Sequence, residues 1–115
     1  MRILVCGGRG YTDRENFFWH MTHSFEGWRG CTIITGAARG ADALGIEFAH
    51  TYGLKLESYP ADWTKHGKAA GPIRNQQMLD DGKPDLVVAF PGGVGTADMV
   101  RRARKAGVEV IEVAP

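Results

Sequence analysis

Short apolar runs, spaced by segments with helix signals, constrain the fold of this chain more than any other sequence feature. The runs are Arg2–Cys6, Cys31–Thr35, Leu54–Tyr59, Leu86–Phe90 and Val108–Val113. Within them apolar residues follow one another rather than alternate with polar ones, which is typical of strands buried on both faces of a parallel sheet. The segments between them that carry helix signals are Asp13–Phe25, Asp42–Tyr52, Pro72–Asp81 and Thr96–Ala106. The pattern predicts an α/β protein with a five-stranded parallel sheet.

Local signals support the predicted helix ends. The segment 12–15 (TDRE) fits a capping box, Pro72 suits a first helical turn, and Gly53 and Gly107 stand where glycines end helices. Right-handed crossovers would place helices on both faces of the sheet, in a Rossmann-like three-layer domain with strand order 3-2-1-4-5. We expect one domain over residues 1–115 and an irregular loop over Pro60–Gly71.

Composition limits the classes of partner. The chain has 14 Lys and Arg against 13 Asp and Glu, so its formal charge of +1 lacks the basic excess typical of nucleic-acid binding. No apolar run approaches the roughly 20 residues that span a bilayer, and the first residues lack a signal-peptide pattern, so we expect a cytoplasmic protein without membrane contact. Cys6, Cys31 and the histidines show no metal-ligand spacing, which predicts buried reduced thiols and neither metal nor cofactor.

Two glycine-rich loops would flank the point where the predicted strand order reverses, which is where ligands bind in such sheets. These loops are 7–13 (GGRGYTD), with Gly7, Gly8 and Arg9, and 91–96 (PGGVGT), with Pro91, Gly92, Gly93, Gly95 and Thr96. Glycines let backbone amides approach a ligand, and a helix start attracts negative charge, so the second loop could hold a phosphate. The alternative is a sharp strand-to-helix turn with Thr96 as N-cap. The loop is neither a Walker A motif nor a GxGxxG motif.

Further candidates follow the second and third predicted strands. In the segment 36–42 (GAARGAD), Gly36 and Gly40 surround Arg39, which could clamp a phosphate. Asp42 could accept a hydrogen bond from a ribose hydroxyl or cap its own helix. Arg9 of the first loop either contacts the ligand or is solvated.

The long segment supplies an aromatic ring beside cationic and amide groups, from Trp63, Lys68, Gly71, Arg74 and Asn75. Trp63 could stack on a base, or it could anchor the segment on the core. Arg74 near a helix N-terminus opposes the helix dipole, which favours a functional role. The basic run Arg101–Lys105 near a helix C-terminus complements the dipole, so we interpret it as a solvated face. The aromatic residues from Phe17 to Trp28 indicate helix packing or a dimer surface.

Four segments together resemble the YspA-like (YAcAr) proteins of the SLOG superfamily. They are 36–42 (GAARGAD), 61–63 (ADW), 66–75 (HGKAAGPIRN) and 90–98 (FPGGVGTAD), and the resemblance extends over nearly the whole chain. It implies a Rossmann-like fold and binding of nucleotides or nucleotide-derived signals. Relatives include the LOG-type phosphoribohydrolases, which cleave the N-glycosidic bond of a nucleoside monophosphate, and the DNA-processing protein DprA. Relatives often pair, which implies a homodimer or higher oligomer.

The chain departs from the LOG-type pattern at two positions. The pattern Pro-Gly-Gly-x-Gly-Thr-x-x-Glu falls on Pro91 to Met99, so methionine replaces the glutamate, and Asn75 replaces the lysine that follows the arginine matched by Arg74. Methionine cannot act as a base. Asp98 is the nearest carboxylate, so Arg74 and Asp98 would be the catalytic residues only if the protein is an enzyme.

We therefore expect a domain that binds a nucleoside phosphate, an ADP-ribose-like molecule or a signalling nucleotide, as a sensor or a sequestering module. The expected ligand-binding residues are Gly7, Gly8, Arg9, Gly36, Arg39, Gly40, Asp42, Trp63, Lys68, Gly71, Arg74, Asn75, Pro91, Gly92, Gly93, Gly95 and Thr96. The alternatives are LOG-like hydrolysis of a nucleoside 5′-monophosphate and DprA-like binding of single-stranded nucleic acid.

Overall fold

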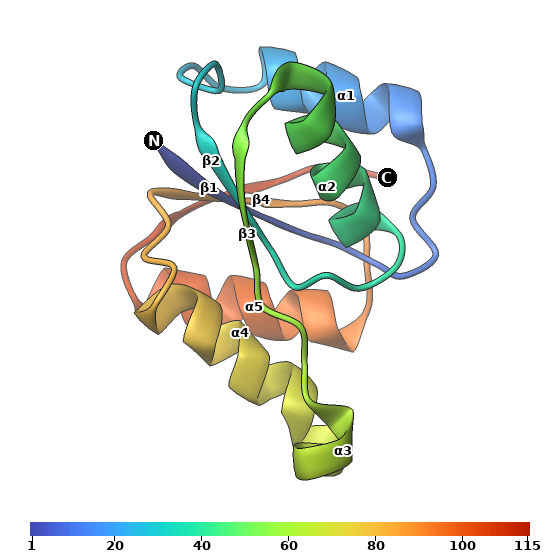
Figure 1. Ribbon diagram of the computed structural model, residues 1–115, viewed down its shortest axis with the longest axis vertical. Helices are drawn as coiled ribbons and strands as arrows, with labels where there is room; N and C mark the ends of the chain where they lie inside the picture. Colours follow the sequence, from blue (N-terminus) through green and yellow to red (C-terminus); the bar gives the residue numbers. More distant parts are fainter.

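A computed structural model describes all residues, 1–115, and contains one parallel sheet with helices on both faces (Figure 1). The strands are β1 (Arg2–Cys6), β2 (Thr32–Thr35), β3 (Lys55–Ser58), β4 (Leu86–Ala89) and β5 (Glu109–Glu112). Their order in the sheet is β3-β2-β1-β4-β5, and every neighbouring pair is parallel. The predicted α/β Rossmann-like fold and the predicted strand order are confirmed.

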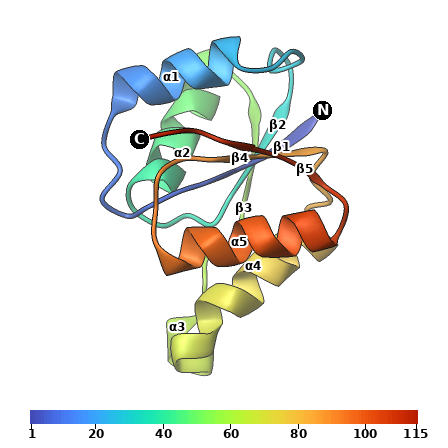
Figure 2. The ribbon, with the colours of Figure 1, turned by 180° about the vertical axis from the view of Figure 1, so that it is seen from behind.

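The helices form the two outer layers. They are α1 (Arg14–His23), α2 (Ala41–Tyr52), α3 (Trp63–His66), α4 (Ala70–Asp80) and α5 (Val94–Lys105). Helices α1 and α2 cover one face of the sheet, and α4 and α5 cover the other, as both views show (Figures 1 and 2). Helix α3 extends beyond the sheet at one end of the molecule, beside the start of α4. No helix combines the length and the apolar character that crossing a membrane requires.

The apolar runs are explained by burial on both sides of the central strands. In β1, Ile3 and Val5 pack in a cluster with α1 and α2, whereas Leu4 and Cys6 pack in a second cluster with α4 and α5. Successive strand side chains point to opposite faces, so a strand covered on both faces needs an unbroken apolar run. We call these sets the α1/α2 cluster and the α4/α5 cluster.

The helix ends match the sequence signals in part. Gly53 ends α2 with a φ of 62° and Gly107 follows α5 with a φ of 78°, as predicted. The predicted capping box is wrong by one residue, because Asp13 is the N-cap of α1 and its Oδ1 accepts from the Asn16 amide at 3.1 Å. The alternative that Thr96 is the N-cap of α5 is also wrong, since α5 begins at Val94.

The segment Pro60–Gly71 is more regular than the predicted loop. Asp62 caps α3 by accepting from the Lys65 amide at 3.0 Å, and a 3-10 turn, Gly67–Ala69, joins α3 to α4. Pro72 lies in the first turn of α4, as expected. This helical segment holds Trp63 beside the carboxyl ends of the strands.

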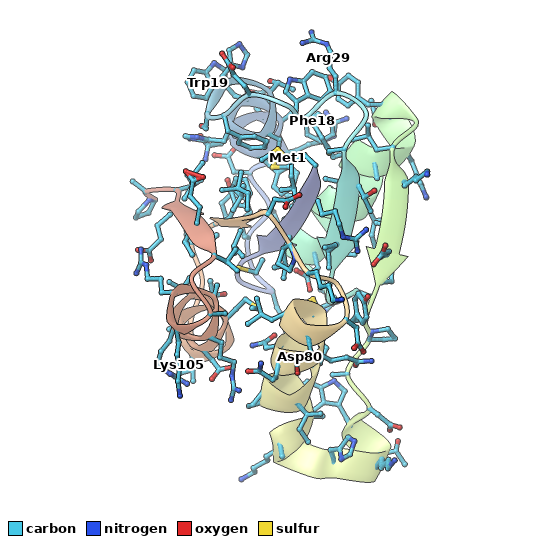
Figure 3. All side chains as sticks on the ribbon, turned by 90° about the vertical axis from the view of Figure 1, so that its left-hand side faces the viewer. Met1, Phe18, Trp19, Arg29, Asp80 and Lys105 are labelled. Carbon is cyan, nitrogen blue, oxygen red and sulfur yellow. The ribbon has the colours of Figure 1, made fainter.

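The aromatic residues are mostly core, as expected. Phe17 and Trp28 are buried in the α1/α2 cluster, but Trp19 is 54% exposed and stacks on the ring of His23. Trp19 lies on the outside of the molecule at the end away from α3 (Figure 3). Cys6 and Cys31 are buried free thiols, which agrees with the sequence analysis.

Candidate functional site

A cleft of about 650 Å³ opens beyond the carboxyl ends of the strands where the strand order reverses, between β1 and β4. The loops after β1, β2 and β4 meet there with α3 and α4. The predicted residues that line the cleft are Gly7, Gly8, Arg9, Asp42, Trp63, Lys68, Gly71, Arg74, Asn75, Gly93, Gly95, Thr96 and Asp98. The fold thus gathers most of the predicted site into one cavity.

The remaining predicted residues lie beside the cleft. Gly36 and Arg39 line a smaller adjoining pocket, and Gly40, Pro91 and Gly92 line neither cavity.

Gly40, Pro91 and Gly92 fix the loops against one another. The Gly8 amide donates to the carbonyl oxygen of Pro91 at 2.9 Å. A Cβ on Gly92 would lie 2.6 Å from the Gly8 nitrogen, and one on Gly40, whose φ is 74°, would collide with the Gly8 carbonyl oxygen. These positions therefore require glycine for close packing.

The start of α5 presents free backbone donors. None of the amides from Gly92 to Thr96 donates a hydrogen bond within the protein, and Ala97 is the first residue to donate, to Gly93 at 3.0 Å. Gly93 to Thr96 line the cleft. Free amides and the positive end of the helix dipole together make this edge of the cleft attractive to an anion.

Arg74 lies between the cleft and the loop after β2. Its Nη1 donates to the Gly36 carbonyl oxygen at 2.7 Å, and its Nε donates to Asn75 Oδ1 at 3.1 Å. A side chain on Gly36 would collide with this guanidinium. Burial lowers the pKa of Arg74, with the nearby charge of Arg9 acting in the same direction and that of Asp42 opposing it.

Asp42 does not cap its own helix, so that alternative is wrong. It lies in the first turn of α2, is 7% exposed, and its Oδ2 accepts from the Ala38 amide at 3.1 Å. Burial raises the pKa of Asp42 and outweighs the hydrogen bond from Ala38 and the charges of Arg74 and Arg9, which lower it. The carboxyl therefore closes the loop after β2 while it borders the cleft.

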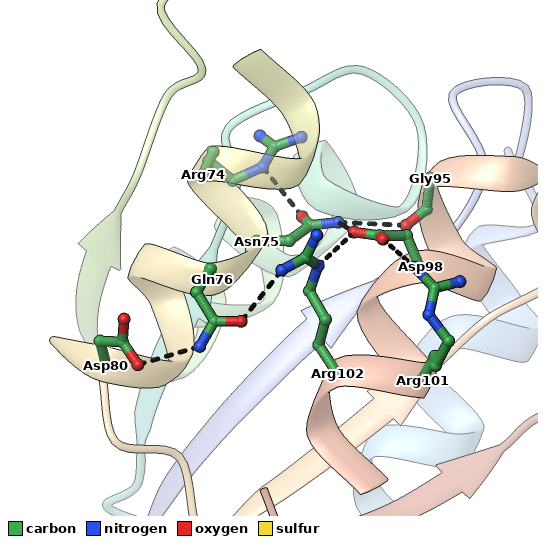
Figure 4. A network of polar contacts seen from close by, with 8 residues as sticks. All are labelled: Arg74, Asn75, Gln76, Asp80, Gly95, Asp98, Arg101 and Arg102. Carbon is green, nitrogen blue, oxygen red and sulfur yellow. Dashed lines mark hydrogen bonds and ion pairs between the residues drawn. The ribbon is translucent and has the colours of Figure 1, made fainter. Parts of the chain in front are cut away.

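Asp98 is the centre of a polar network that joins α4 to α5 (Figure 4). Its Oδ1 accepts from Arg101 at 2.5 Å, and its Oδ2 accepts from Arg102 at 2.9 Å and from Asn75 at 3.0 Å. The Asn75 amide also donates to the Gly95 carbonyl oxygen at 3.2 Å. The network holds Asn75 against the first turn of α5.

The surroundings of Asp98 favour its charged form. Burial alone would raise its pKa, but the hydrogen bonds from Asn75 and Arg102 and the charges of both arginines outweigh burial and lower the pKa. The interpretation of the basic run as a solvated face holds for Arg101, whose side chain is 69% exposed although it pairs with Asp98. It is wrong for Arg102, whose side chain is 30% exposed and donates to Asp98 and Gln76. Arg101 also lines the cleft.

Trp63 is not an anchor on the core. The residue is 48% exposed and lines the cleft, and the Arg9 guanidinium lies 5.2 Å from its ring centre. Neither Arg9 nor Lys68 forms an ion pair with a carboxylate of the protein. The mouth of the cleft therefore offers an aromatic face and free positive charge.

Comparison with known proteins agrees with this geometry. The model of the YspA, cpYpsA-related SLOG family (YAcAr) matches residues 1–66, from β1 to the end of α3. The chain belongs to this family. It is also 36% identical over 120 residues to the Gene 61 protein of Mycobacterium phage D29, an alignment that covers 96% of this chain and 94% of that protein. SLOG membership points to binding or processing of a nucleotide-related ligand.

Several residues that line this SLOG cleft were not among the predicted ligand-binding residues. Cys6, Met78 and Met99 form an apolar floor, together with Pro72 and Val94 at the rim. Met99, at the position of the LOG-type glutamate, is 1% exposed within the α4/α5 cluster. Burial raises the pKa of the Cys6 thiol to about 12, so this thiol stays protonated at neutral pH.

Proposed function

We propose that the protein binds a nucleotide or nucleotide-derived ligand, with a phosphate on the backbone amides of Gly92 to Thr96. The observation that carries this proposal is that these consecutive amides, at the N-terminus of a helix, donate no hydrogen bond inside the protein. An anion held there would satisfy donors that otherwise depend on water.

The charge and shape of the cleft support the same ligand class. Its volume of about 650 Å³ suits a small molecule, and the lining contains Arg9, Lys68, Arg74 and Arg101 against the carboxylates of Asp42 and Asp98. This excess of positive charge favours a phosphorylated ligand. The exposed ring of Trp63 would stack on the base, and Asp42 would accept from a ribose hydroxyl.

The polar network favours binding over hydrolysis. A glycosidic hydrolase needs a carboxyl group that exchanges a proton or stabilises the developing cation. Asp98 accepts hydrogen bonds from two arginines and one asparagine, and its lowered pKa makes it a weak base. Met99 supplies no such group, so we infer a sensor or a sequestering module.

Calorimetric titration with a nucleotide panel tests the proposal. The panel contains nucleoside 5′-mono- and diphosphates, cyclic nucleotides and ADP-ribose, with the unphosphorylated nucleosides as controls. We expect binding by one phosphorylated class and none by its nucleoside, because the glycine loop would recognise the phosphate. Absence of heat with every phosphorylated compound would overturn the proposal.

A pair of variants at Gly93 separates binding from folding. Gly93 is the N-cap of α5, and nothing lies within 4 Å of a Cβ built there. Gly93→Asp would place a carboxylate on the free amides, so we expect at least tenfold weaker nucleotide binding without loss of stability. Gly93→Ala leaves the amides free and should bind within about threefold of the wild type. Equal binding by Gly93→Asp and the wild type would contradict the assigned phosphate position.

Hydrolysis is tested in the same samples. We expect no free base on chromatography after incubation with nucleoside 5′-monophosphates. Release of base that is lost in Asp98→Asn would favour the phosphoribohydrolase alternative.

A further inference from the structure

A second, smaller cavity of about 250 Å³ adjoins the cleft on the side of β2 and β3. It is enclosed by the loop after β2, residues 36–39, and by Pro60 and Ala61 before α3. Four residues line both cavities and thus form the wall between them: Arg9, Ala38, Trp63 and Arg74. A ligand in the cleft would therefore be in reach of this pocket.

Positive charge in the pocket exceeds the negative charge near it, because Asp42 acts on Arg9 and Arg74 but its single charge faces three arginines. The pocket lining holds Arg9, Arg39 and Arg74 and no carboxylate. Arg9 and Arg39 form no ion pair with any carboxylate of the protein. Asp42 lines the larger cleft instead, where its Oδ2 accepts from the Ala38 amide. Like charges held together in the folded state are unfavourable unless an anion joins them.

Backbone donors lie beside the same arginines. The amides of Arg39 and Gly40 donate no hydrogen bond within the protein, and they immediately precede α2. The dipole of this helix adds to the positive potential at the loop. Arginine and free amides are the groups that phosphate oxygens prefer in proteins.

We propose that Arg9, Arg39 and Arg74 form a second phosphate-binding subsite, separate from the glycine loop at the start of α5. The inference rests on the proposed function in one respect: a single nucleotide would occupy both subsites across the pair formed by Arg9 and Trp63. The ligand would then carry two separate phosphate groups, as a nucleoside bisphosphate or a dinucleotide does. Arg39 is the diagnostic residue, because it lines the pocket and not the cleft.

NMR titration of the nitrogen-15-labelled protein with inorganic phosphate tests the two subsites independently of any base. We expect two separate sets of shifted amide signals, one from residues 92–96 and one from residues 38–40. In Arg39→Ala the second set should lose its response while the first keeps it. Arg29→Ala is the matched control, since Arg29 is exposed at the end of the molecule away from α3 (Figure 3) and should change neither set.

The outcomes separate the two proposals. Shifts confined to residues 92–96 would overturn the second subsite and leave the proposed function standing. Shifts confined to residues 38–40 would support the second subsite and contradict the phosphate position on the glycine loop. Absence of both sets would count against both.

Calorimetry with adenosine 5′-monophosphate and adenosine 3′,5′-bisphosphate tests whether one ligand spans both subsites. We expect the bisphosphate to bind about tenfold more tightly than the monophosphate to the wild type, from added charged hydrogen bonds. Arg39→Ala should abolish this advantage by weakening the bisphosphate more than the monophosphate. Equal affinities in the wild type, or equal weakening of both ligands by the variant, would overturn the inference.

Discussion

Asp42 and Asp98 are buried in the wall of one cleft, yet their pKa values move in opposite directions. For Asp42 burial dominates and raises the pKa, whereas for Asp98 hydrogen bonds and arginine charges outweigh burial and lower it. The difference follows from the number of donors, since Asp42 accepts from one amide and Asp98 from three side chains. Stability should therefore depend on pH through these two groups with opposite sign.

Asp98→Asn should lower the free energy of unfolding by about 2 kcal/mol at pH 7, because it removes a charge that two arginines face. The folded pKa of Asp98 lies below its ordinary value of 3.8, so its contribution is present above pH 3.8 and is lost as the pH falls through the folded pKa. Urea unfolding at pH 7 and pH 3 should show a smaller difference between variant and wild type at pH 3.

Asp42→Asn is the matched comparison. The raised pKa means that the contribution of Asp42 is greatest below pH 3.8 and declines as the pH rises through the folded pKa. As the pH falls, the free energy of unfolding of the wild type should therefore rise relative to that of Asp42→Asn. It should fall relative to that of Asp98→Asn. Parallel pH profiles for both variants would contradict this account of the cleft.

Gly36→Ala should destabilise the protein by about 1–3 kcal/mol, because a Cβ there collides with the Arg74 guanidinium and displaces it from the Gly36 carbonyl oxygen. Thermal unfolding measures the loss. Gly10→Ala is the control, since nothing lies within 4 Å of its Cβ, and it should change stability by less than about 0.5 kcal/mol. Similar losses in both variants would show that Gly36 is not needed for the position of Arg74.

At the scale of the elements, the same change in two glycines should have opposite effects. Gly53 ends α2 with a φ of 62°, whereas Gly95 lies inside α5, and neither would place a Cβ within 4 Å of another atom. Gly53→Ala should cost about 1 kcal/mol through left-handed strain, and Gly95→Ala should add about 0.5–1 kcal/mol through helix propensity. Denaturant unfolding without ligand compares them, and a stabilised Gly53→Ala would refute the assigned helix end.

The strands were predictable because their burial on both faces leaves an unbroken apolar run, which few other structures produce. Helix α3 was not predictable, because its four residues are too few to show a helical pattern of apolar residues. Its one signal is the N-cap Asp62, and the nearby Pro60 and Gly67 make the segment resemble a loop. The misplaced cap at Thr12 has a similar cause, because Thr12 and Asp13 are both good N-caps and tertiary packing selects between them.

The gathering of the predicted residues in one cleft was predictable from topology, because the loops after β1 and β4 meet where the strand order reverses. Side-chain partners were not predictable. Arg101 and Arg102 suit the C-terminal half of a helix by charge alone, and only their spacing of three and four residues from Asp98 indicates the pairing. The sequence left open whether Trp63 faces a ligand or the core, and the position of α3 decides between them.

At the scale of the whole molecule, the sheet separates two apolar clusters that share its central strand. The α1/α2 cluster contains 14 buried residues and the α4/α5 cluster contains 10. Neighbouring residues of β1 belong to different clusters, so both clusters depend on the position of this one strand. Loss of packing on one face of the sheet therefore destabilises the other face as well. We therefore expect both clusters to unfold together in a chain of this size.

Unfolding should be one cooperative transition, and a probe on one face should report damage on the other. In a Trp19→Phe, Trp63→Phe background, fluorescence reports Trp28, which is buried in the α1/α2 cluster. Met78→Ala in the α4/α5 cluster should lower the free energy of unfolding by about 2 kcal/mol, through a cavity and lost transfer energy. The unfolding midpoint measured by fluorescence and the midpoint measured by far-ultraviolet circular dichroism should shift by the same amount. If Met78→Ala does not change the unfolding midpoint that Trp28 fluorescence reports, the two faces of the sheet unfold separately. The shared strand β1 would then not couple the two clusters.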